Sequence, residues 1–190
     1  MTDKQRERIK DKIKKIKATL LAEKRKFGGF DDSRGLRYLP PELYLKIKDF
    51  NGGLRYLKWF NKHFPDDVGF PEFLFASTVI LFNVRKLEEA EDYALKTYFS
   101  ETFLFDVFFG KELKVLNKNV SDQQVEYLKD FAYRHDQEDF VEFSNWLSKF
   151  LQSERFVKAK NEYDDITQQL ETEPVGPRRT MLVERLYSLK

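Results

Sequence analysis

Apolar residues recur every three or four positions along most of the chain, which is the spacing of one face of an α-helix. Within residues 2–26, four such residues follow at intervals of four, three and four: Ile9, Ile13, Ile16 and Leu20. Thr2 and Gln5 match a capping box, in which each side chain bonds a free backbone N–H of the first turn. This segment is therefore predicted to be one long helix that ends at Gly28-Gly29.

The same spacing predicts two helix–turn–helix units within residues 40–102. The first unit opens at Pro40-Pro41, because proline suits the first turn of a helix, and closes at Pro65. Asn51-Gly52-Gly53 is a turn signal that is expected to break this unit into two helices. The second unit starts at Pro71 and runs to Thr102. Two helical hairpins in succession are thus expected.

The rest of the chain reads as further helices. Residues 98–110 hold six aromatic side chains, which favours a core segment and leaves a ring-lined groove as the alternative. Residues 111–120 are polar and predict a loop. Helices are then expected over 121–134, 153–171 and 180–189, with another running to Leu151. Ser121 is the predicted N-cap of the helix over 121–134. Asp136 is the predicted N-cap of the helix that runs to Leu151.

Residues 40–102 resemble tetratricopeptide repeats (TPRs), whose 34-residue unit pairs two helices. In the first unit Tyr44 occupies the aromatic position, residues 47–50 the turn, Gly53 the small position and Pro65 the closing proline. The second unit matches less closely, with Ala90 as its small residue. Four of its positions depart from the family pattern: Ser77, Thr78, Thr97 and Thr102. The resemblance implies an all-α stack of hairpins, covered at its ends by the basic first helix and the C-terminal helices.

TPRs usually bind peptides in a groove lined by their first helices, and the resemblance transfers that groove to eight positions. They are Tyr38, Glu42, Leu45, Lys46, Phe75, Val79, Phe82 and Asn83. The pair of residues that grips a peptide C-terminus in one TPR type is replaced here by Tyr38 and Glu42. A groove rich in rings suits an apolar or extended partner segment. The alternative is that these side chains are buried by the first helix or by residues 98–109.

Composition is consistent with one folded all-α domain of 190 residues, in which 41% of residues are hydrophobic and 19 are Phe. There is no Cys and there are only two histidines, so a thiolate or His-rich metal site is excluded. No set of residues matches a nucleophile with its base, and we expect neither catalysis nor a cofactor. No signal peptide or membrane-spanning stretch is predicted, which points to the cytoplasm.

Charge is distributed unevenly along the chain. Residues 3–26 hold eleven Lys and Arg against four Asp and Glu, a balance of +7, whereas the whole chain carries +2. The first helix could therefore pack on the body through its apolar stripe, pair with a second copy, or contact nucleic acid. The leading hypothesis is a non-catalytic scaffold that binds a protein or peptide. The alternative is a nucleic-acid-associated protein that uses this basic helix.

Overall fold

The computed structural model describes residues 1–30, 32–111 and 122–189, and these residues are helical with no β-strand among them. The prediction of an all-α protein is confirmed. The chain divides into two compact units, Met1–Ala90 and Glu91–Lys190. The boundary lies inside the second predicted hairpin, whereas the first predicted hairpin belongs entirely to unit 1.

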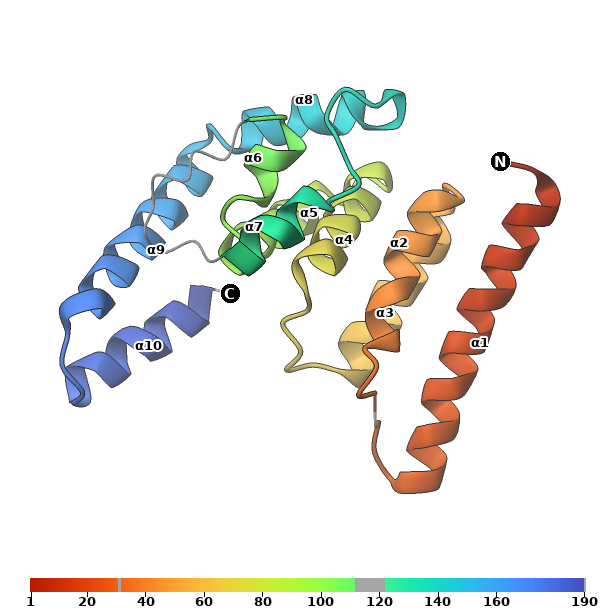
Figure 1. Ribbon diagram of the computed structural model, residues 1–190, viewed down its shortest axis with the longest axis horizontal. Helices are drawn as coiled ribbons and strands as arrows, with labels where there is room; N and C mark the ends of the chain where they lie inside the picture. The colour runs from red at the N-terminus through yellow and green to blue at the C-terminus, as the bar shows by residue number, and fades with distance from the viewer. Residues whose placement is uncertain (31, 112–121, 190) are drawn as a thin grey trace. The chain divides into compact units, whose positions relative to one another are not determined.

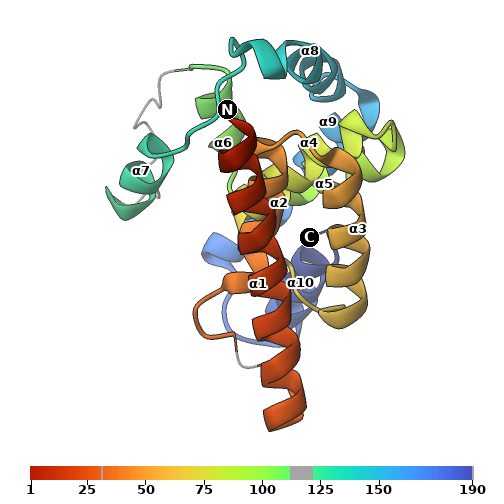
Figure 2. The same ribbon diagram turned by 90° about the vertical axis from the view of Figure 1, so that its right-hand side faces the viewer.

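The described residues of unit 1 form four complete α-helices, one 3₁₀ turn and the first residues of a fifth helix. The complete elements are α1 (Asp3–Phe27), η1 (Leu36–Tyr38), α2 (Leu39–Lys46), α3 (Phe50–His63) and α4 (Pro71–Asn83). The helices α2, α3 and α4 all pack against one another, and α1 lies along α2 (Figures 1 and 2). This arrangement is compatible with a helical repeat fold.

The apolar stripe of α1 packs on the body, which is one of the three alternatives predicted for this helix. Ile13, Ile16 and Leu20 are buried in a cluster with Leu43 and Ile47 of the α2 segment. The predicted capping box at Thr2 is formed, and Gly28 ends the helix in the left-handed conformation. At the C-terminal end of α2, the guanidinium of Arg6 donates to the carbonyl oxygen of Ile47 at 2.8 Å. The long basic helix is thus packed as part of unit 1.

The two predicted hairpins share one turn geometry. Lys48 and Arg85 are the only described non-glycine residues with positive φ, at 55° and 62°. Each lies two residues past a helix, and the two positions are 37 residues apart, as are Gly53 and Ala90. The N–H of Lys48 donates to Leu45 and that of Arg85 to Phe82, at 2.9 and 3.0 Å. The internal repeat is therefore visible in the backbone.

The break expected at Asn51-Gly52-Gly53 lies four residues too late, because α2 ends at Lys46 and α3 already begins at Phe50. Asp49 caps this helix by accepting the N–H of Gly52 at 2.8 Å. The two glycines are needed for packing: a Cβ on Gly52 would lie 2.5 Å from the Tyr44 ring, and one on Gly53 2.7 Å from Ile80. Gly52 thus admits the partner helix α2, and Gly53 admits α4, the first helix of the next hairpin.

Unit 2 holds most of α5 (Leu87–Ser100) and the rest of the helices. They are α6 (Leu104–Phe108), α7 (Asp122–Lys129), η2 (Glu138–Phe140), α8 (Val141–Phe150), α9 (Glu154–Thr172) and α10 (Pro177–Leu189). The last two form an antiparallel hairpin (Figure 1). Rings fill the core of this unit: Phe108 meets Phe143 with 5.8 Å between ring centroids, and Phe150 meets Phe156 at 5.6 Å.

Three helix boundaries in unit 2 differ from the sequence expectation. The helix expected to reach residue 134 stops at Lys129. Asp136 does not cap a helix, because η2 intervenes and α8 begins at Val141. Pro177 starts α10 three residues before the expected 180, as proline fits the first helical position. The expected loop through 112–120 and the Ser121 cap lie outside the described residues.

Candidate functional site

The eight positions transferred from TPRs do not form an open groove. All four of their apolar members are buried, Phe75 to 0% exposure, Val79 to 2%, Phe82 to 5% and Leu45 to 8%. Every residue of α4 from Phe73 to Phe82 is buried, and α4 packs on both α2 and α3. Even its hydroxyls face inward: Ser77 and Thr78 donate to carbonyls one turn back at 2.6 and 2.8 Å. The four apolar positions of the expected groove are therefore part of the core.

The polar members of that set are engaged in local contacts. Glu42 and Lys46 form an ion pair at 2.9 Å along α2. The amide of Asn83 donates to the carbonyl oxygen of Val79 at 2.8 Å. These side chains therefore bond within their own helices; Lys46 is exposed, and Glu42 and Asn83 are half-buried.

Tyr38, the last of the eight, belongs to a structural clasp that we define as Asp32, Arg37, Tyr38 and Asp67. Asp67 accepts from the Tyr38 hydroxyl at 2.7 Å and from Nε of Arg37 at 2.6 Å. Asp32 accepts the backbone N–H of Arg37 at 2.8 Å. Burial, followed by the Asp67 hydrogen bond, raises the pKa of Tyr38 to about 12. The clasp ties the segment before α2 to the loop after α3.

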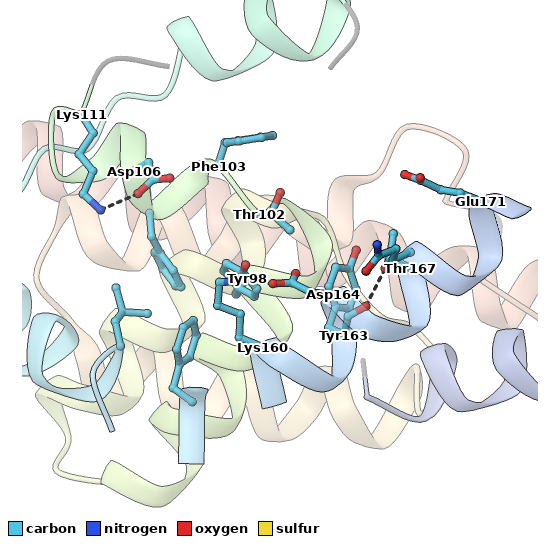
Figure 3. Close-up of a pocket in the computed structure, with 14 residues that line it drawn as sticks. Tyr98, Thr102, Phe103, Asp106, Lys111, Lys160, Tyr163, Asp164, Thr167 and Glu171 are labelled. Atoms are coloured by element: carbon cyan, nitrogen blue, oxygen red, sulfur yellow. Dashed lines mark hydrogen bonds and ion pairs between the residues drawn. The ribbon is translucent and has the colours of Figure 1, made fainter. Parts of the chain in front are cut away.

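An open cleft is present instead in unit 2, between the α5–α6 segment and α9, and Figure 3 shows its lining. Its volume is about 620 Å³, within the size range of ligand pockets. Five rings line it: Phe103 and a set that we call its floor, Tyr98, Phe105, Phe156 and Tyr163. Tyr98 and Phe156 meet edge to face with 5.1 Å between centroids. The rings are held by one another, so the floor is preformed.

Charged side chains line the rim of the cleft as opposite-sign pairs. Lys111 bonds Asp106 at 2.8 Å (Figure 3). Lys160 of α9 bonds Asp164 one turn further on. Thr167, Gln168 and Glu171 continue the polar edge along α9. Because both lysines already have a carboxylate, the rim presents no concentrated charge of either sign. It suits a polar, uncharged main chain better than a strongly charged ligand.

The Tyr98 hydroxyl is the clearest hydrogen-bond donor offered to this cleft. Within the described residues no hydrogen bond engages it, and Figure 3 draws it beside Asp164. Burial, with a smaller contribution from Asp164, raises the pKa of Tyr98. Burial likewise raises the pKa of Tyr163. Both phenols therefore keep their protons at neutral pH and can donate to a carbonyl of a bound segment.

Part of this site could be predicted from the sequence. The ring-lined groove considered for residues 98–110 is present at Tyr98 and Phe105, and the ring-bearing face of 153–171 contributes Phe156 and Tyr163. The polar rim was missed, because Asp106, Lys160 and Thr167 carry no motif. Their meeting depends on how α9 packs on the α5–α6 segment, which periodicity does not specify.

Neither histidine lies in the cleft. Nδ1 of His63 bonds the carbonyl oxygen of Trp59 at 2.7 Å, and the ring stacks on Trp59. The ring of His135 is half-buried, and its centroid lies 5.7 Å from that of the Phe109 ring. In the described part of the chain, no three His, Asp or Glu residues are grouped to hold a metal ion. No described helix is both long and apolar enough to cross a membrane.

Comparison with known proteins returned no significant match to a protein-family model, to a curated protein or to a solved structure.

Proposed function

We propose that this protein is a non-catalytic interaction module of TPR-like helical-repeat type that binds a protein segment in the α5–α9 cleft. The open, ring-floored cleft of about 620 Å³ is the observation that carries the proposal. The TPR-like assignment is supported by the matching turns at Lys48 and Arg85 and by the close approach at Gly53.

The chemistry of the cleft indicates what kind of segment fits. A floor of rings favours one large apolar or aromatic side chain as the anchor. The free Tyr98 hydroxyl suits a backbone carbonyl of the partner, and the neutralised rim tolerates polar flanking residues. The described cleft-lining residues include no His, Cys or Ser, so they supply no nucleophile–base pair of the usual kind. Binding is the activity that this set supports.

The test is selection of 12-residue peptides from a displayed random library on the full-length protein, followed by calorimetry with the synthetic peptides. Selected peptides are expected to share one aromatic or large aliphatic residue. Thr167→Arg places a long cation at the exposed edge of the cleft and is expected to weaken binding at least tenfold. Thr172→Arg is the matched control, since Thr172 is exposed on the same helix and does not line the cleft.

Two results would contradict the proposal. One is that the Thr167 and Thr172 variants bind selected peptides equally well, which would place the site elsewhere. The other is that no selected peptide binds the wild-type protein below about 100 μM, a free energy of only about −5.5 kcal/mol. Circular dichroism of both variants shows whether the helices are retained.

A further inference from the structure

The basic residues of α1 divide into two flanks with different surroundings. On one flank the cations are engaged: Lys10 pairs with Glu7 at 2.8 Å, and Lys14 lies 3.8 Å from Asp11. Further along the same flank, Lys17 lies over the Trp59 ring at 5.2 Å. This flank faces α3, which carries Trp59.

The other flank carries a second set of cations, which we name the α1 stripe: Lys4, Arg8, Lys12 and Lys15. At 3.6 residues per turn these four side chains fall within about 80° of one another around the helix axis, over a length of about 16 Å. All four residues are exposed. In the part of the chain that the structure describes, none of them has an ion pair or hydrogen bond. Acids are kept to the edges of the stripe.

We infer that the α1 stripe binds the phosphodiester backbone of a nucleic acid strand. Four unpaired cations in a row attract a polyanion by releasing its condensed counterions, which needs no particular base sequence. The stripe contains no ring on which a base could stack, so binding is expected to be independent of sequence. A lipid surface is the less favoured partner, because the apolar stripe of α1 is buried against the body and cannot insert.

The docking of α1 on α2 strengthens this inference. A free basic helix would lose conformational entropy on binding, whereas α1 is held by its buried stripe and by the Arg6 contact. The four cations are therefore already aligned. This surface lies in unit 1 and shares no residue with the proposed peptide cleft, so either function can fail without the other.

The experiment is fluorescence anisotropy of a labelled 20-nucleotide oligouridylate with the full-length protein, across a salt series. With four single-strand contacts, affinity is expected to fall about 50-fold between 50 and 200 mM salt. In Lys12→Gln/Lys15→Gln two contacts remain, and the same salt change is expected to weaken binding only about sevenfold. The variant also binds more weakly at 50 mM salt.

The matched control is Lys10→Gln/Lys14→Gln, which removes the same charge from the engaged flank of the same helix. It is expected to keep the wild-type salt dependence and to change affinity no more than about twofold. Equal loss in the two double variants would show that only net charge matters and would overturn the inference. So would absence of RNA binding at 50 mM salt, or binding to anionic phosphatidylserine vesicles that the RNA does not displace.

Discussion

The helix α4 of unit 1 and the helix α9 of unit 2 both carry rings at helical spacing, but α4 is buried whereas α9 borders an open cleft. In α4 every position from Phe73 to Phe82 is buried, so its rings have neighbours on all sides. In α9 only Phe156 and Ile166 are buried, and one edge of the helix remains polar and exposed. The comparison teaches that a ring-rich face becomes a binding surface only where no second layer covers it.

The largest effect that tests this comparison is expected from Phe75→Ala. The Phe75 side chain has 0% exposure, so its removal is expected to lower the free energy of unfolding by about 3–5 kcal/mol. The same substitution at Phe103, a half-buried residue lining the cleft, is expected to cost about 1 kcal/mol. Urea unfolding followed by circular dichroism measures both. A small effect at Phe75 would reopen the TPR-derived groove as a binding surface.

A second test addresses the clasp that occupies the expected position of Tyr38 in the groove. Asp67→Ala removes an acceptor shared by Arg37 and Tyr38, and its carboxylate side chain is only 13% exposed. Loss of hydrogen bonds to a charged group is expected to lower the free energy of unfolding by about 2–3 kcal/mol. Thermal or urea unfolding gives the value.

The neighbouring Asp66 provides the control for this substitution, because it is exposed and within the described residues has no hydrogen bond or ion pair. Asp66→Ala is expected to change stability by no more than about 0.5 kcal/mol. If Asp66 and Asp67 were equally sensitive, the clasp would have no special role. Tyr38 would then be available to a partner after all.

Much of the fold could be predicted from the sequence because its signals are local. The stripe of Ile13, Ile16 and Leu20, the cap at Thr2 and the small residue Gly53 each act within one or two helices. The site could not be predicted in the same way. Whether Phe75 faces a groove or a neighbouring helix depends on packing between segments distant in sequence, and periodicity only states that one face is apolar.

The same limit applies to the chemistry of individual side chains. Asp67 lies in an ordinary-looking Asp66-Asp67 pair, and only the fold shows that one of the two receives Arg37 and Tyr38. Likewise, the lysines of α1 look alike in sequence, and their division into an engaged flank and the α1 stripe follows from where Trp59 and the acidic residues lie. The first distinction depends on contacts between side chains that are 29 or more residues apart in sequence. The second depends on the orientation of the docked helix α1.

The smallest expected effect is the alkaline behaviour of Tyr38, and it sharpens the contrast between a clasp and a free groove residue. Its pKa is raised to about 12 in the folded protein, first by burial and then by Asp67, whereas a free tyrosine titrates near 10. The folded state therefore holds this proton more tightly than the unfolded chain does. The resulting stabilisation is fully present below pH 10 and is lost as the pH rises from 10 through 12.

Urea unfolding at pH 8, 10 and 11 measures this loss. Wild-type protein is expected to lose stability between pH 10 and 11, and Tyr38→Phe to lose less, since it has no phenol to ionise there. Part of the loss remains in the variant, because burial also raises the pKa of Tyr56 and Tyr98. An identical pH dependence in the two proteins would mean that Tyr38 is not held by Asp67 in solution. Its ring would then be free to meet a ligand, as the repeat resemblance first implied.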